Sequence, residues 1–257
     1  MKITSLSVAS VVAAAAVAFG AHAKTKPSPE PIADTPIIKA VSSYILLDRT
    51  GSMSDIWDEA LGSVNAYAEA IGKVEDGEAD DLETSVTLAV FDHQEGFQFD
   101  VLRTNVEPDA WTTVTNDEVS PRGMTPLFDA INRTITMAEA DNPEKAVIVI
   151  MTDGHENSSR EVTRQGAKAA LDRAEARGCE VVFLGAEFAS FGDADAIGVD
   201  RSKQMAVSAG TLSLTQERLA KKARDYGKGE EAEIVFDAED RALAEEEDVK
   251  DRKGSNR

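Results

Sequence analysis

Cysteine, histidine and basic residues are scarce in this chain of 257 residues, and each scarcity excludes a class of function. The single cysteine, Cys179, cannot form a disulfide within the chain, and the three histidines form no Cys/His cluster that could hold zinc or an iron–sulfur centre. Any bound metal is therefore expected to have oxygen ligands. The 27 Lys and Arg residues stand against 47 Asp and Glu residues, which gives a formal net charge of −20. Such an acidic surface repels phosphate, so we expect no nucleic-acid partner.

Long apolar runs are equally rare, and the one that is present lies at the start of the chain. Residues 1–23 combine the basic Lys2, an Ala/Val-rich stretch and the sequence Ala21-His22-Ala23, which are the features of a secretory signal peptide and its cleavage site. We expect cleavage after Ala23 and export of the remainder to the periplasm or the medium. The stretch is short for a membrane span and no second apolar run follows it, so we expect no span after cleavage. An uncleaved membrane anchor is the alternative.

The remaining composition predicts one large domain with a flexible segment on each side. Hydrophobic residues make up 42% of the chain, which is enough for a core of normal size. Residues 24–39 contain closely spaced prolines and predict an extended linker. Residues 40–226 are expected to form the domain, and residues 227–257 an acidic extension that is partly disordered. Within this extension residues 234–236 form a strand-like run, and roughly the last fifteen residues are expected to be a mobile tail.

Apolar periodicity predicts strands that alternate with helices in the domain. Most of the strands are continuously apolar, which is typical of a parallel sheet covered by helices on both faces, and a hairpin supplies one antiparallel edge strand. The predicted fold class is therefore α/β, with a doubly wound, mainly parallel sheet. The predicted elements are a strand at 41–47, a helix at 56–71, a hairpin of 84–91 and 97–102, a helix at 126–140, a strand at 146–151, a helix at 161–177, a strand at 180–185, a short apolar run at 205–207 and a helix at 212–226.

Polar side chains follow two of the buried strands. Asp48 ends the first strand, and Thr50 and Ser52 place two hydroxyl groups in the glycine-containing turn after it. Asp153 follows the strand at 146–151, and Thr125 stands in a Gly/Pro loop just before a helix. Because the carboxyl ends of parallel strands gather at one edge of a sheet, we expect these residues to converge into a site of two carboxylates and three hydroxyls that suits Mg²⁺ or Mn²⁺. The first turn taken alone is equally consistent with a helix cap.

The three segments together resemble the von Willebrand factor type A domain and its metal-ion-dependent adhesion site. The family pattern of Asp-x-Ser-x-Ser, a distant Thr and a distant Asp falls on Asp48, Thr50, Ser52, Thr125 and Asp153, with Thr50 replacing the usual serine. The resemblance covers roughly residues 41–226 and implies a Rossmann-like fold. It further implies that the three hydroxyls bind the metal directly, while the two aspartates act through water. The metal would then keep one coordination position for an acidic side chain of a partner protein, whose identity the sequence does not reveal.

Two other functions fit parts of the same pattern. One is a scaffold or assembly component in which the site is vestigial, and such a protein would keep its contacts in the presence of a chelator. The other is a metal-dependent phosphohydrolase with Asp48 as its nucleophile, although a second carboxylate at the position of Thr50 and a lysine near the later Asp-Gly pair are missing. His155 follows Asp153 closely but has no nucleophile beside it, so we expect it on the rim of the site rather than in catalysis. The sequence therefore predicts a binding protein and no enzyme.

Overall fold

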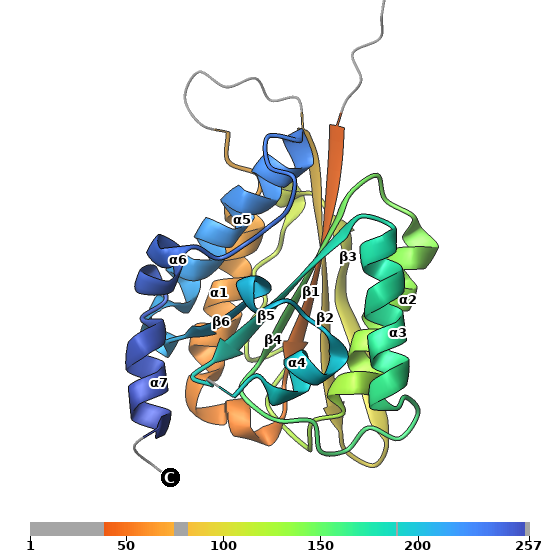
Figure 1. Cartoon of the computed structure of the whole chain (residues 1–257), viewed down its shortest axis with the longest axis vertical. Coiled ribbons are helices and arrows are strands. Elements are labelled where there is room, and N and C mark those ends of the chain that lie inside the picture. The colour runs from red at the N-terminus through yellow and green to blue at the C-terminus, as the bar shows by residue number, and fades with distance from the viewer. Residues whose placement is uncertain (1–38, 75–81, 189, 255–257) are drawn as a thin grey trace, which may run out of the picture. The chain divides into compact units, whose positions relative to one another are not determined.

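A six-stranded sheet forms the centre of the computed structural model, which describes residues 39–74, 82–188 and 190–254 (Figure 1). The strand order is β3-β2-β1-β4-β5-β6, in which β3 pairs antiparallel with β2 and the other neighbouring strands pair in parallel. This arrangement confirms the predicted α/β class and its single antiparallel edge strand. The strands are β1 (Lys39–Asp48), β2 (Leu82–His93), β3 (Phe97–Val106), β4 (Ala146–Thr152), β5 (Cys179–Ala186) and β6 (Gln204–Val207).

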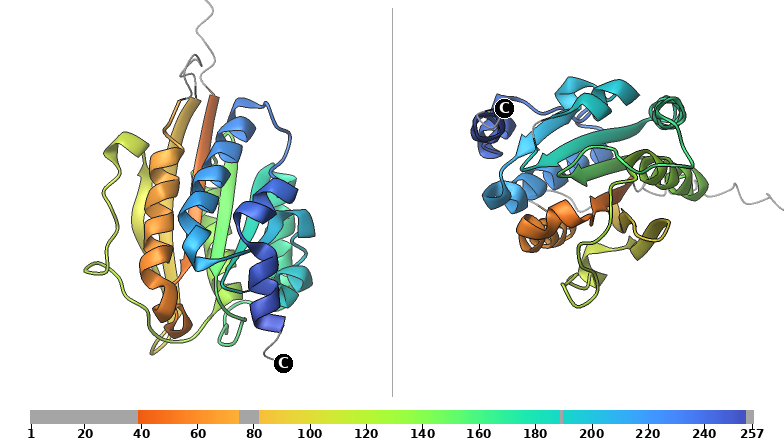
Figure 2. Two further views of the ribbon diagram at one scale, coloured as in Figure 1. Left: turned by 90° about the vertical axis from the view of Figure 1, so that its left-hand side faces the viewer. Right: turned by 90° about the horizontal axis from the view of Figure 1, so that it is seen from below.

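Helices cover both faces of the sheet (Figures 1 and 2). Alternation along β1 decides which face each side chain serves: Ile45 and Leu47 belong to the core shared with α1 and α5, whereas Tyr44 and Leu46 belong to the core shared with α2 and α3. The α-helices are α1 (Trp57–Ala70), α2 (Leu127–Asp141), α3 (Arg164–Ala176), α4 (Gly192–Ile197), α5 (Leu212–Lys228), α6 (Ala238–Leu243) and α7 (Glu246–Gly254). The shorter 3-10 helices are η1 (Gly51–Ile56), η2 (Pro108–Ala110), η3 (Arg201–Lys203) and η4 (Ala209–Thr211).

The two central strands place the polar residues that follow them side by side. Leu47 of β1 lies opposite Met151 of β4, and all residues of β4 are buried. Since both strands run in the same direction, their carboxyl ends lie at the same edge of the sheet, toward the bottom of Figure 1. Asp48 ends β1 and Asp153 follows β4 at this edge. The sheet therefore brings together two residues that are far apart in sequence.

The segment after α5 differs from its prediction. Residues 234–236 form no strand, although Ile234 and Phe236 are buried. The expected mobile tail contains α7, which lies against β6 and buries Val249 and Glu246. A charged helix of this kind has no apolar stripe along its length, so only its contacts with β6 and α6 distinguish it from a solvated tail.

Two sequence expectations concern segments outside this description. The signal peptide at residues 1–23 and nearly all of the linker at 24–39 lie outside the described residues. Within the described part of the chain, no helix has the length and apolar character needed to cross a membrane.

Candidate metal centre

Asp48 occupies the deepest position of the candidate site. Its side chain is fully buried at the end of β1. One carboxylate oxygen, Oδ1, accepts a hydrogen bond of 2.7 Å from the amide of Thr50, and the other, Oδ2, accepts one of 2.6 Å from the hydroxyl of Thr152. The turn that follows β1 and the end of β4 therefore hold this carboxylate from two sides.

The three predicted hydroxyl groups and the second carboxylate form a continuous chain of contacts. Thr50 Oγ1 lies 3.1 Å from Ser52 Oγ and 3.3 Å from Thr125 Oγ1. Ser52 Oγ donates to Asp153 Oδ1 at 2.7 Å. All five residues that the sequence singled out thus come together, delivered by the turn after β1, the loop before α2 and the loop after β4.

One side of this cluster opens to solvent. Ser52 is exposed and Asp153 is half-buried, whereas Thr50 and Thr125 are buried. A Cβ atom on Gly154 would lie 3.6 Å from Thr125 Oγ1 and 3.7 Å from Ser52 Oγ, in van der Waals contact with both hydroxyls. Glycine at this position therefore leaves free space directly beside the oxygen atoms.

Electrostatics of the cluster favour a cation. Burial raises the pKa of Asp48 to about 7, and the negative charge of Asp153 adds to this rise, while hydrogen bonds from Thr152 and Thr50 oppose it. The neighbouring Arg49 does not offset this charge, because its guanidinium turns to Asp92 at 2.6 Å and to Asp100 at 2.5 Å. A divalent cation held by the hydroxyls would stabilise both carboxylates in their charged forms.

The donor set fits a small, hard cation. Among the described residues, no group of three or more His, Cys, Asp and Glu side chains is arranged to hold a metal ion. The cluster instead offers three hydroxyl oxygens and two carboxylates, which is the ligand chemistry of Mg²⁺ and Mn²⁺ rather than of zinc. The residues present therefore fit the metal that the sequence led us to expect.

Comparison with known proteins identifies the family. The sequence model of the von Willebrand factor type A domain matches residues 44–219, which is more than half of the chain. The chain belongs to the von Willebrand factor type A domain family. The match begins within β1 and ends within α5, so this type A domain includes all six strands of the sheet.

Solved structures with the same fold include domains of two pilus proteins and of a mussel byssus protein. The von Willebrand factor domain of the type V pilus tip protein Mfa5 from Porphyromonas gingivalis superimposes with a TM-score of 0.57 at 11% identity, covering 78% of this chain and 99% of that domain. The pilus adhesin SpaC from Lactobacillus rhamnosus GG gives a TM-score of 0.55 at 15% identity, covering 73% of this chain and 31% of the adhesin. Proximal thread matrix protein 1 from the mussel byssus gives 0.51 at 13% identity, covering 72% and 46%.

These likenesses establish the fold of the type A domain and nothing finer. The chain spans less than half of the byssus protein and about a third of the pilus adhesin. No curated protein sequence matches the chain.

The loop that carries Thr125 is fixed to both of its neighbours in the type A domain. Met124 exchanges two backbone hydrogen bonds with His93 at the end of β2, and the amide of Gly51 donates to the carbonyl of Gly123 at 3.2 Å. Gly123 has a φ of 70°, and a Cβ atom there would lie 2.7 Å from the carbonyl oxygen of His93. Glycine is therefore required for the loop to approach β2 this closely.

Several residues that support the site were missed or misjudged from sequence. Asp129 accepts hydrogen bonds from the amides of Arg160, Glu161 and Val162. The helix predicted to begin at 161 begins at Arg164 instead, after the Thr163 cap. Thr152, whose hydroxyl orients Asp48, was not among the candidate residues of the sequence. In the sequence only its position directly before Asp153 pointed to the site, because Asp48, which it contacts, lies 104 residues away.

Glu156 also has a structural role that the sequence did not indicate. Its carboxylate accepts from the amides of Phe128, Ser158 and Ser159, which ties the loop after β4 to the start of α2. These bonds make Glu156 an internal brace of the loop.

His155 lies near Asp153 but points to α4. Its side chain is exposed, its Nδ1 lies 3.0 Å from Asp193 Oδ2, and its ring meets Phe188 edge-on. These contacts place His155 beside the cluster rather than within its chain of oxygen atoms.

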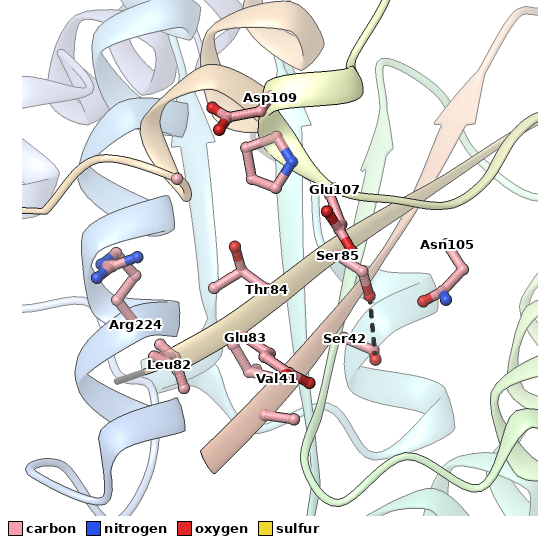
Figure 3. Close-up of a pocket in the computed structure, with 13 residues that line it drawn as sticks. Val41, Ser42, Leu82, Glu83, Thr84, Ser85, Asn105, Glu107, Asp109 and Arg224 are labelled. Atoms are coloured by element: carbon pink, nitrogen blue, oxygen red, sulfur yellow. Dashed lines mark hydrogen bonds between the residues drawn. The ribbon is translucent and has the colours of Figure 1, made fainter. Parts of the chain in front are cut away.

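A pocket lies at the opposite ends of the strands (Figure 3). It has a volume of about 570 Å³ and is lined by the first residues of β1 and β2, the end of β3, η2 and Arg224 of α5. Ser85 donates to Ser42 within it, and Arg224 projects from its helix at one side (Figure 3). Since Asp48 and Asp153 leave the sheet at the other edge, this pocket is separate from the candidate metal centre.

Proposed function

We propose that this chain is an exported protein-binding module that holds Mg²⁺ or Mn²⁺ on Asp48, Thr50, Ser52, Thr125 and Asp153. The observation that carries the proposal is the unbroken series of contacts, 2.7 to 3.3 Å long, between three hydroxyls and a carboxylate beside the open space at Gly154. Export rests on the signal peptide predicted at residues 1–23. Mass spectrometry of the purified protein would test export. Cleavage after Ala23 lowers the mass by that of residues 1–23, whereas a chain with an uncleaved anchor keeps its full mass.

Each group has a distinct part in this binding. Thr50, Ser52 and Thr125 offer neutral oxygen atoms, and Asp48 and Asp153 supply negative charge behind and beside them. When bound, the metal would supply an electrophilic centre for an acidic side chain of a partner protein. Thr152 and the Thr50 amide keep Asp48 in place, and Gly154 leaves room on the open side.

The position of Asp48 favours binding over phosphate hydrolysis. A nucleophilic carboxylate must reach its substrate, whereas Asp48 is fully buried and both of its oxygens accept hydrogen bonds. The phosphohydrolase alternative therefore receives no support from the geometry. Thermal unfolding and pull-downs distinguish the scaffold alternative from metal-dependent binding.

Thermal unfolding of residues 24–257, with and without millimolar Mg²⁺ or Mn²⁺, tests the metal site. A metal at 100 times its dissociation constant should stabilise the fold by about 2.7 kcal/mol. In 0.15 M NaCl we expect this shift in the parent and none in Asp153→Ala. If metal left the unfolding temperature of the parent unchanged, this would contradict the metal site and favour the scaffold. Pull-downs would then recover the same partners in Mg²⁺ and in chelator.

A further inference from the structure

Thr125 and Asp153 reach the candidate metal centre on different loops, and one residue joins these loops directly at Thr125. Asn157 accepts a hydrogen bond from the amide of Thr125 on its side-chain Oδ1, at 2.9 Å. Its own amide donates to the carbonyl of Thr125 at 3.1 Å. A single residue therefore holds both backbone polar groups of Thr125.

These two bonds restrict where the Thr125 hydroxyl can lie. With its amide and carbonyl both fixed, the peptide planes on either side of Thr125 cannot rotate freely, so the direction of its Cα–Cβ bond is set. The hydroxyl then lies 3.3 Å from Thr50 Oγ1. Without Asn157, the other backbone hydrogen bonds described for this loop act on Arg122, Gly123 and Met124, all before Thr125.

The loop that contains Asn157 is itself rigidly attached. Glu156 binds the amide of Phe128 at 3.0 Å, and Asp129 binds the amides of residues 160–162. Both braces connect the loop after β4 to the start of α2, which follows Thr125 by two residues. They hold the two loops together at a distance from the hydroxyl, whereas Asn157 acts on the ligand-bearing residue.

We propose that Asn157 is a positioning residue that fixes the Thr125 hydroxyl relative to Asp153 and so sets the affinity of the metal centre. The proposal rests on the proposed metal-binding function. Asparagine suits this task because it offers a neutral acceptor at the required length, and an alanine offers none. Groups that orient metal ligands without touching the metal alter affinity by roughly 10- to 100-fold when they are removed.

The test compares Asn157→Ala with Asn157→Asp and with a control, Thr163→Ala, in the full chain. Asn157→Asp keeps the acceptor oxygen. Thr163→Ala removes a single side-chain hydrogen bond, to the amide of Gly166 in the first turn of α3, away from the metal centre. Mg²⁺ and Mn²⁺ affinities are measured by calorimetry, unfolding is measured in chelator, and hydrogen exchange of the Thr125 amide is followed by NMR in chelator.

We expect Asn157→Ala to weaken metal binding by roughly 10-fold or more and to accelerate exchange of the Thr125 amide. Asn157→Asp should bind metal at least as well as the parent, and Thr163→Ala should bind like the parent despite its lower stability. Parent-like metal affinity in Asn157→Ala would overturn the proposal, as would equal losses in Asn157→Ala and Thr163→Ala.

The exchange measurement separates this proposal from the proposed function. If the parent binds no metal, the proposed function fails, yet faster exchange at Thr125 in Asn157→Ala alone would still establish the positioning contact. Unchanged exchange at Thr125 would overturn the positioning role whether or not metal binds.

Discussion

Asp48 combines full burial with a second carboxylate nearby, and this combination has a measurable consequence in the metal-free protein. The ordinary pKa of 3.8 rises to about 7 in the folded chain because burial penalises the charged form. Between these pH values the folded chain binds one more proton than the unfolded chain, so a rise in pH favours unfolding. The stabilisation that protonated Asp48 gives the folded chain is complete below pH 3.8 and is lost as the pH rises through about 7.

We therefore expect the free energy of unfolding in chelator to fall as the pH rises from about 4 to about 7, and to fall less in Asp48→Asn. Urea denaturation at intervals across this range measures the effect. The comparison with Asp48→Asn removes the contributions of all other titrating groups. Parallel pH profiles for the two proteins would show that Asp48 titrates normally.

Gly154 offers a test of the open side of the centre. Its backbone does not need the left-handed region, so alanine should fold there, but the new Cβ would touch the hydroxyls of Thr125 and Ser52. We expect Gly154→Ala to reduce Mg²⁺ affinity on the order of 10-fold with little change in stability. Calorimetry and thermal unfolding in chelator measure the two effects.

Gly210→Ala is the matched control for this substitution, because no atom lies within 4 Å of a Cβ at that position. It should leave both metal affinity and stability close to those of the parent. Equal affinities in Gly154→Ala and Gly210→Ala would mean that the metal does not use the space beside Gly154.

The residues of the candidate centre could be predicted because each has a local signal. Asp48 and Asp153 follow apolar strands, and Thr50, Ser52 and Thr125 lie beside glycine or proline in turns. Asn157 carries no comparable signal, since its importance depends on a contact with a residue 32 positions earlier. Only the folded chain shows which polar residues, such as Asn157, contact the predicted metal ligands.

At the scale of elements, the apolar pattern predicted five of the six strands and the long helices, and only a short apolar run where β6 forms, but not the end of the chain. A continuous apolar run such as β4 can only be buried, so its placement follows from its composition. The sequence of α7 is charged on all sides, and it is held because Glu246 reaches the edge of β6. Such a helix is decided by long-range contacts, those of Glu246, Val249 and Arg252 among them, which no periodicity records.

Glu246 is therefore expected to stabilise the edge of the sheet. It is 3% exposed, accepts from the amide of Ala206 at 3.1 Å and pairs with Arg241 at 2.9 Å. Glu246→Gln removes the charge that pairs with Arg241 and weakens the bond to β6, so we expect a loss of about 1–3 kcal/mol in unfolding free energy. Urea denaturation measures this loss.

Glu247 provides the control on the same helix. Its side chain is 81% exposed and pairs only with Lys250 among the ion pairs described, so Glu247→Gln should change stability by less than about 1 kcal/mol. If both variants lost the same stability, α7 would not depend on the buried carboxylate.

At the scale of the whole molecule, the net charge of −20 affects how any metal experiment is interpreted. Divalent cations gather around an acidic surface and reduce its self-repulsion, and this stabilises the fold without any specific site. Sodium ions at 0.15 M limit such interactions between exposed charges to about 8 Å. A coordinated metal depends much less on this screening, because its ligands hold it at contact distance and partly out of solvent.

We expect Mg²⁺ to raise the unfolding temperature of both the parent and Asp153→Ala at low ionic strength, but only that of the parent in 0.15 M NaCl. The reason is that Asp153→Ala keeps 46 of the 47 acidic residues, and hence the diffuse attraction, while it loses one carboxylate of the centre. Thermal unfolding at matched total ionic strength, with NaCl replacing MgCl₂ as the reference, separates the two contributions. Equal shifts for both proteins in 0.15 M NaCl would mean that the cation acts only on the surface charge, and the specific centre at the end of β1 and β4 would have to be abandoned.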